Sequence, residues 1–237
     1  MDKKYEFEEP FNEAPYTDLL SIYAHSFADN FTLPALTDYI TGKTMSYGDM
    51  ARRIARLHLF FKSAGLHEGD KVALFGKNTP NWVITFMAVI SYGAVIVPVL
   101  HDFNHADAQN IIAHSDALML FVSDGLFHEL DFEKMPQLRA VVSLDSRTVI
   151  AEREPLHEGN KRHPASPKSI VTSLTRQFRK CYPNGFLPSD IKYKHFDQSQ
   201  TAVLNYTSGT TGFSKGVMLS LDNLRGNVVF GIRSNLH

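Results

Sequence analysis

Residues 71–99 read KVALFGKNTPNWVITFMAVISYGAVIVPV, and this stretch decides the fold. Lys71–Phe75 is a short apolar run with the length of a buried strand, and Ala94–Val99 has the same character. Between them, a helix is predicted to start at Asn78-Thr-Pro-Asn and to continue to about Tyr92. A strand, a helix and a second strand indicate two parallel strands joined by a crossover, which is right-handed almost without exception.

The same alternation extends in both directions from this unit. Towards the N-terminus, the pattern predicts a helix over 17–29, two short extended pieces around Thr41-Gly42-Lys43, and a long amphipathic helix that starts with a Ser46/Asp49 capping box. Towards the C-terminus, it predicts a helix over 105–115, strands over Leu118–Val122 and Arg139–Leu144, a short helix over Asp124–Leu130, a helix over Ser169–Tyr182, a strand over Gln200–Tyr206, an extended piece over Val217–Leu219 and a last helix over Asp222–Asn235. The predicted fold is α/β, a doubly wound and mostly parallel sheet flanked by helices.

The amino-acid composition excludes some classes of function. The chain has 237 residues, is 43% hydrophobic and 21% charged, and carries a net charge of -1, so it has enough apolar residues for a core and lacks the basic bias of a nucleic-acid binder. The charged N-terminus has no secretory signal, and the lone Cys181 fits a reducing compartment, so a cytoplasmic location is expected. Ser91, Gly93 and Pro98 interrupt the longest apolar stretch, which we interpret as core rather than a membrane span.

Residues 151–168 differ in character from the rest. They are polar and charged and contain three prolines, which is typical of a loop or insertion.

The loop at 206–217 reads YTSGTTGFSKGV and connects two apolar strands. Glycines allow close approach of the backbone, successive N–H groups form anion nests, hydroxyls donate to phosphate oxygens or ligate Mg²⁺, and Lys215 adds a positive charge. These features suit a polyphosphate. The loop is not a Walker A sequence, in which Lys precedes Ser or Thr and a helix follows. A generic Ser/Thr/Gly linker is the alternative, although linkers rarely lie between two apolar strands.

This loop closely resembles the signature Y-T-S-G-T-T-G-x-P-K-G-V of the adenylate-forming superfamily, which includes acyl-CoA synthetases. The resemblance implies that the loop holds the ATP phosphates, and it assigns that role to Thr207, Ser208, Gly209, Thr210, Thr211, Gly212 and Lys215. It further implies that Lys215 stabilises the leaving pyrophosphate and that Thr207 contacts Mg²⁺ through ATP.

The resemblance covers roughly residues 16–237. It includes G-D-x-V at Gly69, N-x-x-x-W ending at Trp82, and the strand G-A-x-x-V-P from Gly93. The overall pattern is most similar to long-chain fatty acyl-CoA synthetases. Two positions depart from the family: Ser214 replaces the usual proline, and Leu221 replaces a histidine found in many members.

The implied reaction uses ATP, Mg²⁺ and CoA. A carboxylic acid, in this resemblance a long-chain fatty acid, becomes an acyl-adenylate and then an acyl-CoA. The expected partners are therefore small molecules, and peripheral contact with membranes is left open because long apolar acids reside there. Transfer to a carrier-protein thiol, and a non-catalytic nucleotide-binding module, are the two alternatives.

Later motifs of the superfamily do not occur in the sequence. Residues 1–237 are thus expected to form an incomplete N-terminal domain of an adenylate-forming enzyme, without the rest of the large domain or the C-terminal lid domain, and to be inactive alone.

Other constellations have simpler interpretations. The pairs His101/His105 and His157/His163 lack the spacing and companions of a zinc site. The basic run at 176–180 is interpreted as a solvated helix face, with contact to anionic lipid or to CoA phosphates as the alternative. Trp82 and the aromatic residues Phe60, Phe61 and Phe86 are expected in the core or, less simply, along an acyl tunnel.

Overall fold

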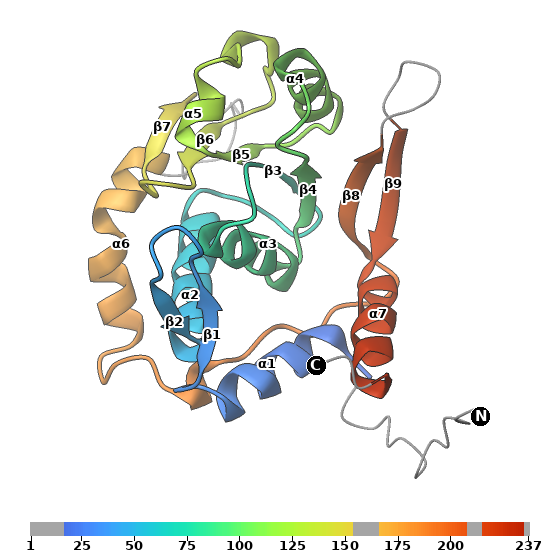
Figure 1. The fold of residues 1–237 in the computed structure, drawn as a ribbon. Helices are drawn as coiled ribbons and strands as arrows, with labels where there is room; N and C mark the ends of the chain where they lie inside the picture. The colour runs from blue at the N-terminus through green and yellow to red at the C-terminus, as the bar shows by residue number, and fades with distance from the viewer. Residues whose placement is uncertain (1–16, 154–165, 208–214, 235–237) are drawn as a thin grey trace, which may run out of the picture.

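The computed structural model describes residues 17–153, 166–207 and 215–234 (Figure 1). Its main sheet has seven strands in the order β7-β6-β5-β3-β4-β8-β9. The strands are β3 (Lys71–Phe75), β4 (Val95–Val99), β5 (Met119–Val122), β6 (Ala140–Ser143), β7 (Val149–Glu152), β8 (Thr201–Thr207) and β9 (Lys215–Ser220). The pairs β3–β4, β3–β5, β5–β6 and β4–β8 are parallel, whereas the edge strands β7 and β9 pair antiparallel to β6 and β8.

This topology is doubly wound. From β3 the chain goes to β4 on one side, then returns past β3 to β5 and continues outward to β6. Adjacent strands β3 and β5 therefore lead into connections that run in opposite directions, and ligands bind α/β sheets at the carboxyl ends of strands near such a point. The predicted fold class is confirmed.

Helices cover both faces of the sheet. They are α1 (Leu19–Asp29), α2 (Tyr47–Ser63), α3 (Pro80–Tyr92), α4 (His105–His114), α5 (Asp124–Phe127), α6 (Pro167–Cys181) and α7 (Leu221–Arg233), with 3₁₀ turns at Phe132–Lys134 and Pro188–Asp190. Strands β1 (Pro34–Thr37) and β2 (Thr44–Ser46) form a separate two-stranded sheet. Along β3, Val72 and Leu74 join the core under α2 and α3, whereas Ala73 and Phe75 join the core under α4. A strand buried on both faces needs apolar residues on both, which explains the unbroken apolar run from Val72 to Phe75.

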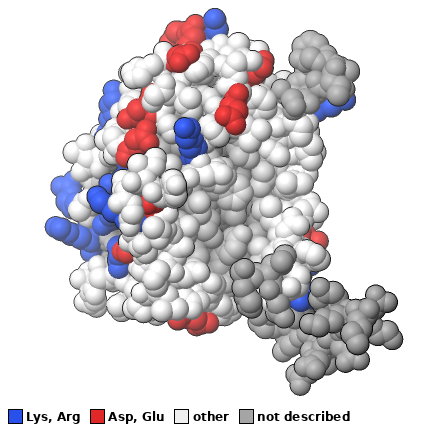
Figure 2. Space-filling model, in the orientation of Figure 1, with Lys and Arg blue, Asp and Glu red and all other residues white. Residues whose placement is uncertain are grey.

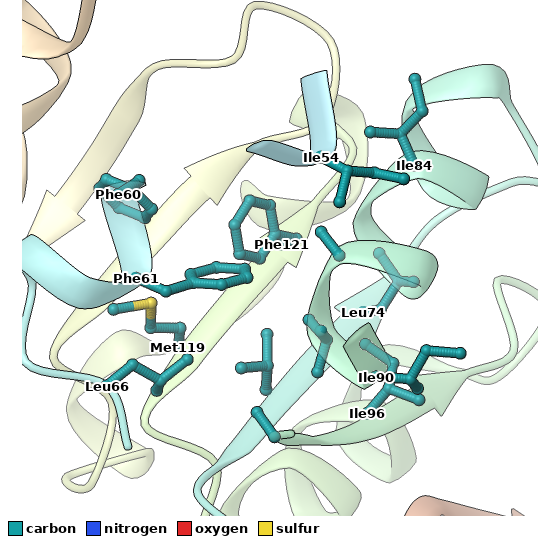
Figure 3. Packing of buried hydrophobic residues seen from close by; sticks show 14 of the residues in the cluster. Ile54, Phe60, Phe61, Leu66, Leu74, Ile84, Ile90, Ile96, Met119 and Phe121 are labelled. Atoms are coloured by element: carbon teal, nitrogen blue, oxygen red, sulfur yellow. The ribbon is translucent and has the colours of Figure 1, made fainter. Parts of the chain in front are cut away.

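Phe60 and Phe61 fill the core between α2 and the sheet (Figure 3). The ring of Phe61 meets Phe121 of β5 edge-on, with centroids 6.1 Å apart, and Tyr92 of α3 at 5.4 Å. Trp82 stacks on Phe86 at the side of this cluster, and both are half-buried. The expectation that these aromatic residues belong to the core is confirmed.

Local signals set the helix ends as predicted. The Ser46 hydroxyl accepts from the Asp49 N–H at 3.1 Å and the Asp49 carboxylate accepts from the Ser46 N–H at 3.2 Å, which is the expected capping box. Gly93 ends α3 with a φ of 87°, a left-handed conformation that favours glycine.

Several boundaries differ from the prediction. Residues 151–152 belong to β7 and residues 167–168 to α6, so the polar segment predicted over 151–168 is too long at both ends. Residues 154–165 lie outside the described residues. Strand β7 is a four-residue edge strand with one buried position, and so short and exposed a strand leaves almost no hydrophobic pattern in the sequence. Strand β9 is also longer than predicted and includes Lys215.

Candidate phosphate-binding site

Strands β8 and β9 form an antiparallel hairpin whose last pair is Thr207 opposite Lys215. Side chains directly opposite each other in such a ladder have Cβ atoms about 5 Å apart. Both residues are exposed at the open end of the hairpin. The structure thus brings together the first and last members of the predicted site, while Ser208, Gly209, Thr210, Thr211 and Gly212 lie outside the described residues.

The direction of β8 puts this end of the hairpin at the carboxyl edge of the sheet. Strand β8 runs parallel to β4 through the pair Ile96–Val203, so Thr207 points the same way as the carboxyl ends of β3, β4, β5 and β6. This is the edge at which α/β sheets bind ligands.

Tyr206 anchors the end of β8. Its side chain is buried, its hydroxyl lies 2.8 Å from Nδ1 of His114 at the end of α4, and the two rings meet edge-on. Burial raises the pKa of Tyr206, and the nearby Asp116 carboxylate adds to this effect. His114 therefore helps to position the end of β8, a role for which the sequence pattern carried no signal.

Gly216 has a packing role inside β9. It lies opposite Tyr206, and a Cβ at this position would come within 3.0 Å of Leu204 and 3.5 Å of the Tyr206 ring. The glycine makes room for the ring that fixes the strand end, and no positive φ is involved.

A second capping box ties the base of the hairpin to α7. The Ser220 hydroxyl accepts from the Asn223 N–H at 3.2 Å, and the Asn223 side chain accepts from the Ser220 N–H at 3.0 Å. Leu221, which departs from the family pattern, is fully buried as the first residue of α7. Leucine in place of the family's histidine therefore packs in the core at the start of the helix, and the capping box beside it is intact.

The described part of the site suits an anion. The Lys215 ammonium provides a positive charge and the Thr207 hydroxyl a neutral donor, and both are exposed on facing strands. A hydroxyl is also a ligand that Mg²⁺ accepts when phosphate oxygens supply most of its coordination. These two residues fit a Mg²⁺-bound polyphosphate.

The histidines show no sign of a metal site within the described ranges. His101 contacts Asp102 at 3.1 Å and His105 contacts Glu129 at 3.0 Å, and no group of three or more His, Cys, Asp or Glu side chains gathers there. His157 and His163 lie outside the described residues. Among the helices that the structure describes, none is long and apolar enough to cross a membrane.

Residues 25–235 match the AMP-binding enzyme family, and the chain belongs to it. This assignment agrees with an α/β sheet that carries a glycine- and hydroxyl-rich loop at its carboxyl edge.

Similar curated proteins include long chain acyl-CoA synthetase 4 of Arabidopsis thaliana, which is 30% identical over 76% of this chain and 25% of its own length. A long-chain-fatty-acid–CoA ligase of Yersinia pestis is 22% identical over 95% of this chain and 41% of its own length. A fatty acid–[acyl-carrier-protein] ligase of Streptomyces coeruleorubidus is 26% identical over 76% of this chain and 28% of its own length. The chain therefore spans well under half the length of these relatives.

Solved structures give the same fold. The anthranilate CoA ligase AuaEII in complex with anthranoyl-AMP superposes with a TM-score of 0.64 at 16% identity, over 87% of this chain and 34% of the ligase.

Proposed function

We propose that this chain supplies the ATP phosphate-binding loop of an enzyme that activates a carboxylic acid as an acyl-adenylate and then forms an acyl-CoA. The placement of Thr207 opposite Lys215 at the carboxyl edge of the sheet, in a member of the AMP-binding enzyme family, supports this function most directly. In this proposal residues 1–237 are the N-terminal part of the adenylation domain, with a polar loop or insertion between β7 and α6. The rest of the large domain and a C-terminal lid domain complete the enzyme.

The loop residues would act on the phosphates. The proposed contacts come from Thr207, Ser208, Gly209, Thr210, Thr211, Gly212 and Lys215. A carboxylate is already ionised at neutral pH, so it attacks the α-phosphate without a general base and pyrophosphate leaves. Catalysis of this step rests on positioning and on neutralising phosphate charge. Lys215 would stabilise the charge that grows on pyrophosphate, and Thr207 would face the Mg²⁺ that accompanies ATP and shields its oxygens.

The proposed acid is a long-chain fatty acid and the proposed acceptor is CoA. Two of the relatives described above carry these substrates in their names, which supports the choice. The partners are then small molecules, with no nucleic acid, and the enzyme would work in the cytoplasm with peripheral contact to membranes that hold its substrate.

A carrier-protein thiol is the second candidate acceptor. The Streptomyces relative is named as a ligase for the acyl-carrier protein, and the adenylating half of the reaction is common to both acceptors.

The test is ATP–pyrophosphate exchange with a panel of carboxylic acids, on this chain and on a longer form that carries the remainder of the enzyme. We expect exchange only in the longer form, strongest with long-chain acids. There, Lys215→Ala should lower the exchange rate about a hundredfold, as loss of one electrostatic contact to a reacting group does. Lys180→Ala removes an exposed charge from α6 and should change nothing.

Unchanged exchange in Lys215→Ala would contradict the role of this lysine. Bound nucleotide without acid-dependent exchange, even in the longer form, would leave a non-catalytic nucleotide-binding module. Acyl transfer to CoA or to a carrier protein in a second assay separates the two acceptors.

A further inference from the structure

A separate cavity of about 270 Å³ lies between α2, α3 and α6 and reaches β5 and β6. Its apolar wall includes Phe60, Ile84, Phe121 and Leu174. Strands β6 and β8 are four strand spacings apart in the sheet, roughly 19 Å. In Figure 1, α6 and the β8–β9 hairpin accordingly lie on opposite sides of the molecule. The cavity is thus distinct from the phosphate-binding site.

Three arginines line this cavity: Arg53 and Arg56 from α2, and Arg147 from the turn between β6 and β7. Arg53 donates to the Asn81 side chain at 3.0 Å, and Asn81 in turn donates to the Leu144 carbonyl at 2.6 Å. This chain of hydrogen bonds holds the Arg53 guanidinium at the cavity wall and leaves its remaining N–H groups available.

Arg56 is held less completely. Its guanidinium lies 4.7 Å from the centre of the Phe178 ring, and its buried Nε has no hydrogen-bond partner among the described residues. A buried donor without a partner costs free energy, so a ligand that accepts from it gains affinity.

The positive charge at this cavity is not balanced. The ion pairs between described residues do not include Arg53, Arg56 or Arg147. Burial lowers the pKa of Arg53 and Arg56, and the proximity of Arg147 lowers both further. Asp49 raises the pKa of Arg53, but this carboxylate is already bound by Arg52 at 2.6 Å. Uncompensated guanidinium groups at a partly buried wall favour an anion.

The volume of the cavity indicates the size of the apolar part of the ligand. Its volume of about 270 Å³ corresponds to roughly nine water molecules, which is enough for a medium-length hydrocarbon tail. Arginine binds carboxylate and phosphate in the same forked geometry. We propose that this cavity binds an anionic amphiphile, with a carboxylate or phosphate head at Arg53, Arg56 and Arg147 and an apolar tail against Phe60 and Leu174.

The surface beside the cavity fits this ligand. Arg176, Arg179 and Lys180 are exposed on α6, and Figure 2 shows basic side chains gathered along that side of the molecule. A basic surface raises the local concentration of anionic amphiphiles next to the cavity. The proposal does not depend on catalysis at the hairpin.

Titration calorimetry on the 237-residue chain tests the proposal with four probes: decanoate, decyl phosphate, decanol and inorganic phosphate. We expect one-to-one binding of decanoate or decyl phosphate, and the tighter of the two identifies the head group. Decanol and inorganic phosphate should each bind at least tenfold more weakly, because each lacks one half of the recognised chemistry.

Substitutions of cavity residues test whether the probes bind in this cavity. Arg56→Glu should weaken the tighter probe at least tenfold, and Leu174→Trp should do the same by filling the apolar end. Lys43→Glu is the matched control, since it reverses an exposed charge between β1 and β2 that neither lines the cavity nor belongs to the basic surface of α6. Lys215→Ala should also leave this binding unchanged, which separates the result from the test of adenylation.

If Arg56→Glu does not fold, Arg56→Lys and Leu174→Trp carry the test. Arg56→Lys keeps the charge but removes the Nε donor and the forked geometry, so it should weaken binding, and Leu174→Trp should weaken it at least tenfold. No binding of either anionic probe, equal binding of decanol, or unchanged affinity in both Arg56→Glu and Leu174→Trp would overturn the proposal.

Discussion

Acidification is expected to destabilise this protein through His58, a histidine of α2 packed between Tyr92 and Tyr193. Its Nε2 lies 3.0 Å from both the Ala88 carbonyl and the Ser91 hydroxyl. The Ser91 hydroxyl donates to Met87 at 2.6 Å, so Nε2 of His58 must carry the hydrogen and donate. Burial lowers the pKa of His58 from 6.5 to about 4, and the hydrogen bond to Ala88 offsets only part of that effect.

The sign and size follow from proton binding by the two states. The unfolded chain takes up a proton on His58 as the pH falls through 6.5, whereas the folded chain resists until about 4. The contribution of neutral His58 to the free energy of unfolding is therefore fully present above about pH 6.5 and is lost progressively towards about pH 4. The full gap corresponds to roughly 3 kcal/mol. The edge of the side chain keeps some contact with solvent, so we expect a loss of about 2 kcal/mol.

Urea unfolding between about pH 7 and about pH 4.5 measures this loss for the wild type and for His58→Gln. The variant should be less stable at neutral pH but should lose less stability on acidification. Burial raises the pKa of Tyr92 and Tyr193, so both stay neutral in this range. Glu68, which lines a cavity together with His58 and Tyr92, is present in both proteins and cancels in the comparison. His25→Gln, at an exposed histidine, is the control. Identical pH dependence of wild type and His58→Gln would refute the argument.

The remaining predictions concern the loop anchor and one helix end. Tyr206→Phe removes only the hydrogen bond to α4 and should lower the free energy of unfolding by about 1 kcal/mol. Tyr39→Phe, at a side chain that is 99% exposed, should have no effect in the same urea titration. Gly93→Ala places a Cβ 2.6 Å from the Phe196 ring at a φ of 87° and should cost about 3 kcal/mol. Gly42→Ala has a similar φ but open space and should cost about 1 kcal/mol, so a cost near about 3 kcal/mol there would show that strain alone explains both.

The centre of the fold was predictable because its signals are local. Strand β3 is apolar from Val72 to Phe75, and Pro80 and Gly93 mark the two ends of α3, so the chemistry of each residue agrees with its place in the fold. Strand β7 was missed because it depends on pairing with β6 more than on its own composition.

The site was predictable only in part. The sequence predicted a strand on either side of the loop, but not the pairing of Thr207 with Lys215, because the expected strands ended at Tyr206 and began at Val217. The contact of Tyr206 with His114 joins residues far apart in the sequence, and so does the gathering of Arg53 and Arg147 around one cavity. Both depend on how helices pack on the sheet, which no local pattern encodes.

The attachment of the β8–β9 hairpin has a consequence for ligand binding. Strand β3 pairs with β4 at five positions, whereas β4 pairs with β8 at Ile96–Val203 alone. The hairpin therefore has more backbone pairing within its own ladder than with the neighbouring strand of the sheet. A ligand that contacts both the end of the hairpin and the adjoining strand ends would add a connection between hairpin and sheet at the place where their own backbone pairing is sparse.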